Sequence, residues 1–358
     1  MNFIDATKSY ETWLGREVRL LPEDLKVKHT LMAESPFPFL RATYYRWAQL
    51  WRATAPGLAK SPSVLAVGDL HIENFGMWRD ADGRLIWGVN DFDETAELPL
   101  AMDLTRLAVS VFLADKNHTL GATRAQIATA ILAGYREGVE SGGCPFVLQE
   151  RHPGLSQIAI ERMKSAPAFW KKISGLPVYK GRQPKTAVRL LMRMLPHGVE
   201  SLRIVHRVAG LGSLGRQRLT AVCQFEGGFI AREVKQLAPP ASQWATGSRP
   251  VPIRYGELLK RAVRCNDPFL RQQNNWIGRR ISPSNSRIEI IDLPREKDVE
   301  RLLHVMGFET ANIHLGSAAR KKLKAAVDGI KLSEFIKASR ALESAVMSDW
   351  KEWRARSR

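Results

Sequence analysis

The sequence has few cysteines, and they lie far apart. Cys144, Cys223 and Cys265 are the three cysteines in 358 residues, and no two of them form a Cys-x-x-Cys pair. A disulfide-stabilised scaffold or a structural zinc site needs more cysteines at closer spacing. Their scarcity argues against both and is typical of a protein from a reducing compartment.

The sequence also has little that could enter a membrane. Its first residues, MNFIDATKSYETWLG, contain no basic segment followed by an apolar core, so no signal peptide is predicted. The most apolar run, residues 98–114, contains Asp103 and Arg106 and is too short and too charged to span a bilayer. We therefore expect no membrane span and a cytoplasmic location.

Acidic residues are outnumbered, and the imbalance is confined to one half of the chain. The sequence has 54 Lys/Arg against 36 Asp/Glu, a net charge of +18. Residues 1–150 hold 15 against 19, a net of −4, whereas residues 151–358 hold 39 against 17, a net of +22. This asymmetry indicates a surface for nucleic acid or acidic lipid, or a solvated face with some cations directed at nucleotide phosphates. No RRM, KH domain or zinc finger is recognisable, so nucleic-acid binding is possible but not favoured.

The clearest chemical pattern lies in residues 64–93, VLAVGDLHIENFGMWRDADGRLIWGVNDFD. Two apolar runs flank Asp80-Ala-Asp-Gly83, which is a typical turn sequence. Residues 75–90 are therefore predicted to form a β-hairpin, which returns the chain beside its starting point.

This hairpin would bring four polar side chains together: Asp69, Asn74, Asp91 and Asp93. Carboxylate and carboxamide oxygens are hard ligands suited to Mg²⁺ bound jointly with phosphate oxygens. A carboxylate beside such a metal can also orient or deprotonate an attacking hydroxyl. The alternative is that Asp82-Gly83 only forms a turn and that the other acidic residues are ordinary surface residues.

The sequence of residues 64–93 resembles that of a known superfamily. GDLHIEN followed by a hairpin and NDFD resembles the catalytic loop and metal-binding aspartate of protein-kinase-like enzymes, in the form found in aminoglycoside and choline phosphotransferases. Together with ESPFPFLRATYYRW upstream, it resembles the bacterial family called domain of unknown function 2252 (DUF2252). The resemblance implies that Asp69 orients or deprotonates the acceptor and that Asn74, Asp91 and Asp93 hold Mg²⁺. Small-molecule kinases usually carry His-Gly-Asp at this point, and this chain has Val67-Gly68-Asp69.

A buried helix is predicted shortly after the hairpin, at Asp103-Leu-Thr-Arg-Leu-Ala108. It follows Asp93 after only about ten residues, which resembles small-molecule phosphotransferases and not protein kinases with their long peptide-docking segment. Asp103 is either a supporting group near the site or an acid favoured by the helix dipole. His314, far along the chain, is expected to be a packed helix residue and not a catalytic one.

A glycine-rich segment follows in the second half, with Gly210, Gly212 and Gly215 between two apolar strands. A GxGxxG pattern that opens a helix would indicate a dinucleotide site. Here a strand, RLTAVCQF, comes next, so the context resembles the kinase glycine-rich loop, in which backbone N–H groups cover nucleotide phosphates.

The third strand of this region, FIAREVKQ, carries Lys235. A lysine that alternates out of a strand is usually exposed to solvent. In the kinase-like context it would bind the α- and β-phosphates and be held by an acid. Glu257, on the helix predicted over 253–266, is the expected partner. Glu233 is the competitor; it shares the strand face of Lys235, and its alternative interpretation is a cross-strand neighbour.

These parts occur in the reverse of the usual kinase order, because the catalytic loop precedes the glycine-rich segment. Residues 1–63 are predicted to be helical and contain no glycine-rich hairpin, so they are not the small lobe. We therefore expect an α+β, two-lobed, protein-kinase-like fold that is circularly permuted, with a small antiparallel β lobe and a larger helical lobe. The expected domains are 1–200, 201–295 and 296–358: the large lobe, the nucleotide-binding lobe, and helices that return to the large lobe.

Two further strands are predicted at 276–280 and 287–293, which would complete a five-stranded small lobe. Backbone groups near 291–295 would then form the hinge beside adenine.

The sequence thus predicts an ATP- and Mg²⁺-dependent phosphotransferase that acts on a small-molecule acceptor. One alternative is AMP transfer to a protein by the same fold, which cations in unusual places, such as Arg216 and Arg218, leave open. Another is a non-catalytic nucleotide- or nucleic-acid-binding module.

Overall fold

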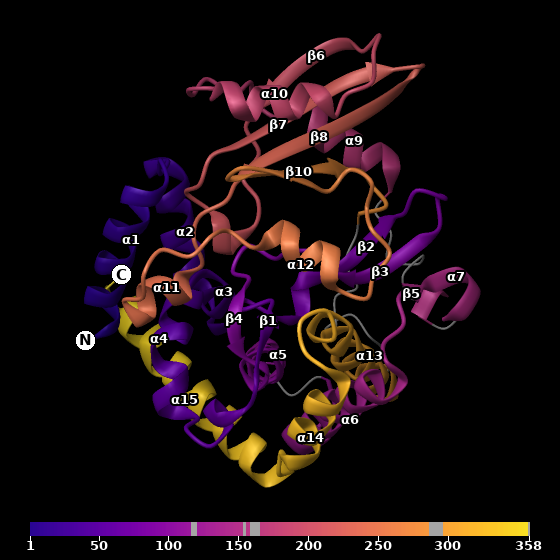
Figure 1. The fold of residues 1–358 in the computed structure, drawn as a ribbon. Helices are drawn as coiled ribbons and strands as arrows, with labels where there is room; N and C mark the ends of the chain where they lie inside the picture. Colours follow the sequence, from indigo (N-terminus) through magenta and orange to yellow (C-terminus); the bar gives the residue numbers. More distant parts are fainter. Residues whose placement is uncertain (116–119, 153–154, 158–164, 286–295, 357–358) are drawn as a thin grey trace.

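A computed structural model of the protein describes most of the 358-residue chain. The described residues are 1–115, 120–152, 155–157, 165–285 and 296–356. They form a helical lobe and a smaller lobe built on one antiparallel sheet (Figure 1). The expected α+β class is therefore confirmed.

The helical lobe draws on both ends of the chain. It contains α1 (Phe3–Glu17), α2 (Pro22–Glu34), α3 (Pro36–Ala42), α4 (Tyr44–Thr54), α5 (Leu100–Ala114), α6 (Arg124–Ser141), α7 (Leu148–Arg151), α13 (Glu296–His314), α14 (Arg320–Gly329) and α15 (Leu332–Arg356). Helix α5 is buried along almost its whole length, because its sequence is apolar apart from Asp103, Arg106 and small hydroxyl residues. It is the central helix, and its two charged side chains therefore need partners inside the protein.

Two small sheets lie at the top of this lobe. Strand β1 (Ser63–Ala66) pairs with β4 (Ala96–Pro99), and β2 (Phe75–Arg79) pairs with β3 (Leu85–Val89), which also pairs with β5 (Phe146–Val147). The β2–β3 hairpin closes through Asp80, whose carboxylate accepts the backbone N–H groups of Asp82 and Arg84 at 3.1 and 2.9 Å. The predicted hairpin is therefore confirmed, together with the turn chemistry that predicted it.

The other lobe is a five-stranded antiparallel sheet with the order β6-β7-β8-β10-β9. Its strands are β6 (Glu200–Val205), β7 (Arg218–Phe225), β8 (Gly228–Gln236), β9 (Arg271–Gln273) and β10 (Trp276–Ile281). Strand β10 confirms the strand expected at 276–280, and β9 was not predicted. The strand expected at 287–293 and the hinge at 291–295 lie outside the described residues.

The two faces of this sheet differ in character, because side chains alternate along each strand. On the outer face, apolar residues such as Leu219 and Val234 pack against α10 (Lys185–Arg193). On the inner face, α9 (Ala166–Ser174) covers the end near Val222 and Ile281. The rest of the inner face is polar and points toward the helical lobe: Arg218, Thr220, Glu233, Lys235 and Arg279.

The lobes divide the chain differently from the expected boundaries at 200 and 295. Helices α9 and α10, which we expected in the large lobe, pack on the sheet. Helix α11 (Ala241–Thr246) and helix α12 (Tyr255–Arg261) lie within the expected small lobe, but Tyr255 and Leu258 of α12 join the core of the helical lobe. The reason is that an amphipathic helix shows which of its faces is apolar but not which surface covers it.

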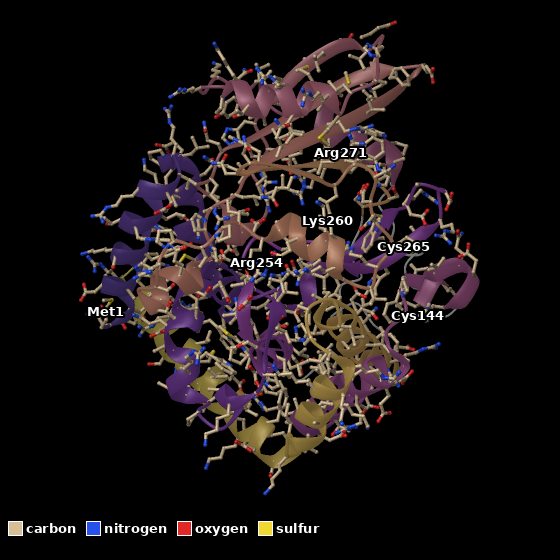
Figure 2. The ribbon with its side chains drawn as sticks, viewed as in Figure 1. Met1, Cys144, Arg254, Lys260, Cys265 and Arg271 are labelled. Atoms are coloured by element: carbon tan, nitrogen blue, oxygen red, sulfur yellow. The ribbon has the colours of Figure 1, made fainter. Side chains whose placement is uncertain are left out.

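The cysteines form no disulfide among the residues that the structure describes. Cys144, Cys223 and Cys265 are free thiols, and Figure 2 shows Cys144 and Cys265 on the same side of the molecule. Among the residues that the structure describes, no helix has both the length and the apolar character needed to cross a membrane.

Candidate functional site

Asp69 lies at the end of a backbone turn that directly follows β1. Gly68, just before it, has φ +81°, and a Cβ there would lie 2.5 Å from the carbonyl oxygen of Glu94, so the turn requires glycine. The Asp103 carboxylate accepts the N–H groups of Val67 and Gly68 at 2.7 and 2.9 Å. Asp103 is therefore a supporting group for the turn that carries Asp69, and it also lies in the first turn of α5.

Asp103 is held in turn from the opposite side. His314 Nε2 lies 3.2 Å from Asp103 Oδ2, and His314 Nδ1 lies 2.9 Å from the Tyr135 hydroxyl. All three side chains are buried. His314 is thus the packed helix residue that we expected, and it connects α13 and α6 to the turn before Asp69.

A buried arginine holds Asp69 itself. Arg106 Nε and Nη2 donate to Asp69 Oδ1 at 2.8 and 2.5 Å, and the guanidinium lies 5.0 and 5.1 Å from the ring centres of Tyr44 and Trp47. Burial raises the pKa of Asp69 to about 7, although Arg106 opposes this rise. The sequence analysis missed Arg106 as a site residue; the signal was an arginine inside an otherwise apolar helix.

The hairpin brings Asn74 beside Asp91 as expected. Asn74 ends a short 3₁₀ turn, and its backbone carbonyl accepts the N–H of Asn90 at 2.9 Å. Its side-chain amide donates to the backbone carbonyl of Asp69. Asp69, Asn74 and Asp91 therefore line one cavity.

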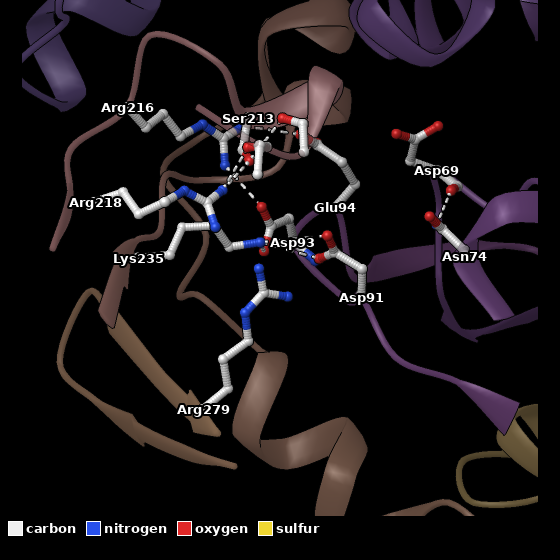
Figure 3. Close-up of polar contacts among 12 residues, drawn as sticks. Asp69, Asn74, Asp91, Asp93, Glu94, Ser213, Arg216, Arg218, Lys235 and Arg279 are labelled. Atoms are coloured by element: carbon white, nitrogen blue, oxygen red, sulfur yellow. Dashed lines mark hydrogen bonds and ion pairs between the residues drawn. The ribbon is translucent and has the colours of Figure 1, made fainter. Parts of the chain in front are cut away.

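Lys235 reaches two of the acidic side chains, Asp91 and Asp93, from the sheet. Its ammonium lies 3.3 Å from both carboxylate oxygens of Asp91 and 2.7 Å from Asp93 Oδ1. Figure 3 shows Lys235 and Arg216 directed toward this pair of carboxylates, with Asp69 and Asn74 set to one side. Two segments of the chain more than a hundred residues apart therefore meet here, and Lys235 is buried and not solvent-facing.

The two carboxylates respond differently to this environment. Burial disfavours the charged form of Asp91, but Lys235 and Arg279 overcome it and hold the pKa of Asp91 below its usual value. Burial and the charge of Asp91 raise the pKa of Asp93 to about 6, against the effects of Lys235 and Arg216. The pair therefore favours one cation between them.

The predicted ion pair between Lys235 and Glu257 is wrong. Glu257 pairs with Arg254 at 2.7 Å and with Arg261 at 3.3 Å. Helix α12 begins directly after Arg254, which Figure 2 labels, and its first residue, Tyr255, lies in the core. Glu257 lies two residues further on, which is about 200° around the helix, so it points away from Lys235.

Glu233 is fully buried and is the cross-strand neighbour of Thr220 and Arg279, as we expected of the competitor. It accepts hydrogen bonds from Thr220 Oγ1 at 3.0 Å, Arg207 at 2.8 Å, Arg279 at 2.7 Å, and Arg218. The sequence analysis missed Arg207 and Arg279. Their signal was the alternation that places Arg279 on the face of Lys235.

The glycine-rich segment connects β6 and β7, and it lies directly over Asp69. Gly210 and Gly215 have φ of +74° and +95°, and a Cβ on Gly212 would lie 3.3 Å from Asp69 Oδ2. The segment is fixed to α2, because the Gly215 carbonyl accepts the N–H of Leu21 at 2.7 Å and the Gly212 carbonyl accepts Lys28 Nζ at 3.3 Å. The glycines therefore allow a close approach of backbone to the carboxylate.

Two adjoining cavities share this region. The one beside Asp69, under the glycine-rich segment, measures about 40 Å³, enough for water but not for a metabolite. The other measures about 440 Å³, which is within the range of small-molecule sites, and it lies between the inner face of the sheet and the β2–β3 hairpin. Asp91 and Gly210 line both cavities.

The donors fit a magnesium ion in part. Within the described residues, no three His, Cys, Asp or Glu side chains gather as a metal site. Asp91 and Asp93 supply two carboxylates, Asn74 lies on the same cavity wall, and a cationic group already lies between the carboxylates. Mg²⁺ commonly takes one or two carboxylates and completes its shell with phosphate oxygens and water, so these three residues suit it when a phosphate is present.

The fold and the site together define an α+β protein with a charged cleft between a helical lobe and a sheet. Residues 19–160 match the model of a family of uncharacterized proteins conserved in bacteria, DUF2252. This match supports the resemblance noted above, and it includes Asp69, Asn74, Asp91 and Asp93. No curated protein matches the chain, and no solved structure does.

Proposed function

We propose that the protein is an ATP- and Mg²⁺-dependent phosphotransferase of kinase-like, circularly permuted architecture that acts on a small-molecule acceptor. The observation that carries the proposal is the meeting of Lys235 with Asp91 and Asp93 beside Asp69. Phosphoryl transfer needs positioning and charge neutralisation more than covalent chemistry. A lysine, two carboxylates and a separate carboxylate in one cleft supply both.

Each residue has a distinct role in this proposal. Asp69 accepts the proton of the acceptor hydroxyl, and Arg106 fixes its orientation. Lys235 moves from the carboxylates to the nucleotide phosphates, and the backbone N–H groups around Gly212 cover those phosphates. Bound Mg²⁺ would neutralise phosphate charge, and Asn74, Asp91 and Asp93 are the residues that would hold it.

The pKa of Asp69 supports the role of a general base. Proton transfer is most effective when the pKa of the base lies near the working pH. Burial raises the pKa of Asp69 to about 7, so about half of the molecules carry the ionised carboxylate at neutral pH, and this carboxylate is basic enough to take a proton.

AMP transfer to a protein is a second candidate that one observation favours. Arg218 donates to the carbonyl oxygen of Ala209 and to Ser213 Oγ, so a cation lies against the glycine-rich segment in addition to Lys235. Extra cations there suit a nucleotide bound with its phosphates in another orientation. The products separate the two reactions, because phosphoryl transfer releases ADP and AMP transfer releases pyrophosphate.

The test is thermal unfolding with and without ATP and Mg²⁺ for the wild type, Lys235→Ala and Asp91→Ala. A ligand that binds only the folded state at about 100 times its Kd adds roughly 2.7 kcal/mol. We expect a Mg²⁺-dependent rise in the unfolding temperature of the wild type and a smaller rise in both variants.

Glu257→Gln is the matched control, because Glu257 lies on α12 and pairs with Arg254 and Arg261 outside the site. It should respond to ATP like the wild type. A wild type that shows no shift at millimolar ATP and Mg²⁺ would overturn the proposal.

A further inference from the structure

The inner face of the sheet carries a cluster that the residue roles proposed for phosphoryl transfer leave unused. It consists of Glu233 with Arg207, Arg218 and Arg279. We infer that this cluster, which lies beside Lys235 on the cleft side of the sheet, is a binding site for a dianionic phosphate group. The inference does not depend on the proposed reaction.

The cluster is built into the fold. Glu233 is fully buried, and its two oxygens accept Arg207 at 2.8 Å and Arg279 at 2.7 and 2.9 Å, with Arg218 and Thr220 as further donors. Arg279 and Thr220 are its direct cross-strand neighbours. Arg218 lies on β7 and Arg279 lies on β10. The sheet therefore fixes the backbone positions of two of the three arginines, which a surface cluster of flexible side chains would not achieve.

The charges in the cluster do not balance. Three guanidinium groups share one carboxylate, and the next carboxylates, Asp91 and Asp93, already hold Lys235. Burial lowers the pKa of Arg218, Glu233 opposes this, and the charges of Arg279 and Arg207 add to the lowering. Buried like charges are costly unless an anion compensates them, so the cluster is prepared for a ligand that brings negative charge.

The cavity in front of the cluster suits that ligand. The cavity has a volume of about 440 Å³, and its lining includes Arg207, Arg218 and Arg279. Three more arginines line it, against three acids. These arginines are Arg41, Arg264 and Arg280, and the acids are Glu73, Asp91 and Asp267.

A phosphate is the anion that matches this arrangement. It carries a charge of about −1.5 to −2 at neutral pH and offers several acceptor oxygens. Guanidinium groups donate to phosphate in a fixed, two-pronged geometry and remain charged when buried. The phosphate can come from the nucleotide itself or from a second, phosphorylated substrate, and competition experiments separate these sources.

The test uses inorganic pyrophosphate without divalent ions, because this probe has neither a base nor a metal. We expect it to raise the unfolding temperature of the wild type. Arg279→Gln should weaken the apparent Kd for pyrophosphate about tenfold or more, since it removes a charge-assisted pair of hydrogen bonds. Arg207 and Arg218 still hold Glu233 in this variant, and Arg207→Gln, which changes a more exposed position, is the second variant if Arg279→Gln unfolds.

Arg193→Gln is the matched control, with the same loss of charge at an exposed position on α10, which covers the outer face of the sheet. It should bind pyrophosphate like the wild type. The inference is overturned if pyrophosphate does not stabilise the wild type, or if Arg279→Gln binds it as well as the wild type does.

Two further arms identify the source of the phosphate. If ATP competes with pyrophosphate and Arg279→Gln weakens both, the site holds a phosphate of the nucleotide. If pyrophosphate and ATP with Mg²⁺ stabilise additively, the site holds a second anionic substrate. Failure of the proposed function would show as loss of Mg²⁺-dependent ATP binding, with binding of pyrophosphate unchanged.

Discussion

At the scale of single residues, Asp69 and Arg106 illustrate how a reactive group is kept in a defined state. Arg106 has no exposed surface, and the rings of Tyr44 and Trp47 lie against it. An arginine in this position can neither leave nor lose its proton. Asp69 Oδ1 is therefore committed to Arg106, and a Cβ on Gly212 would lie 3.3 Å from the other oxygen, Oδ2.

We predict that turnover depends on pH through Asp69. Its pKa is raised to about 7, so below this pH the folded protein holds a proton on the carboxyl and the carboxyl cannot accept another. The rate should rise with pH up to about 7 and level off above it. The measurement is phosphate release from ATP between about pH 5.5 and 8, since the cavity beside Asp69 has room for water as an acceptor.

Asp69→Asn completes this prediction. It should lower the rate about 10²-fold or more and leave the stabilisation by ATP and Mg²⁺ in place, because Asp69 is not a phosphate ligand in the proposal. A rate that stays constant across this pH range, or an active Asp69→Asn enzyme, would contradict the role of Asp69 as base.

Residue roles could be predicted from the sequence only where the partners are close along the chain. Asp69 and Asn74 are five residues apart, and turn chemistry brings Asp91 back to them, so their meeting was predictable. Arg106 is 37 residues from Asp69, and its pairing depends on how α5 packs. Glu257 was chosen because its helix follows the strand, but the direction in which it points depends on which face of α12 joins the core.

At the scale of elements, α6 and α13 pack with their backbones in close contact. A Cβ on Gly134 would lie 1.8 Å from the carbonyl oxygen of His304, and a Cβ on Gly307 would lie 2.1 Å from that of Ile131. The two backbones therefore touch at both glycines. This contact also places His314, at the end of α13, beside Tyr135 of α6.

We predict that Gly307→Ala destabilises the protein although alanine favours helices. Alanine gains up to about 1 kcal/mol in helix propensity, but its methyl group would force α6 and α13 apart. Overpacking of this kind typically costs about 1–3 kcal/mol, and contact with backbone places the expected net loss toward the upper end. Denaturant unfolding measures this change directly.

Gly329→Ala is the control for this experiment. Gly329 ends α14, and a Cβ there meets nothing within 4 Å. It should be neutral or slightly stabilising. If Gly307→Ala were as stable as Gly329→Ala, the close contact between α6 and α13 would be disproved.

Elements with strong local signals were predictable, and their partners were not. The β2–β3 hairpin has a turn sequence between apolar runs, and β7, β8 and β10 have clear strand character. Strand β9, with the sequence Arg-Gln-Gln, is short and polar, and it exists because β10 pairs with it. Helices α9 and α10 lie before the sheet in the chain, and apolar patches on its two opposite faces determine where they pack.

At the scale of the whole molecule, exposed lysines from the basic second half of the chain lie at two ends. Exposed lysines of α9, Lys171 and Lys172, belong to the sheet lobe, whereas exposed lysines of α14, Lys321 and Lys322, belong to the opposite end of the helical lobe (Figure 1). These four lysines of residues 151–358 are therefore part of two separate surfaces. Chain order alone could not show this, because α13–α15 return to the lobe formed by the first half of the chain.

We predict weak, non-specific nucleic-acid binding for this reason. A protein that makes 6–10 phosphate contacts on one surface loses about 10³–10⁵ in affinity between 50 and 200 mM salt. Lysines at opposite ends cannot contact one short duplex together, so fewer contacts form and binding to a short labelled DNA or RNA should be undetectable at about 200 mM salt. Fluorescence anisotropy across this salt range provides the measurement.

The salt dependence of nucleic-acid binding also tests the role of the arginines in the cleft. If binding persists at about 200 mM salt, a shared basic surface exists and the nucleic-acid interpretation regains support. If binding of nucleic acid disappears while pyrophosphate still binds, the exposed lysines and the arginines of the cleft have different roles. The exposed lysines are then solvated, whereas Arg207, Arg218 and Arg279, held by Glu233 on the inner face of the sheet, are the positive groups arranged to recognise a phosphate.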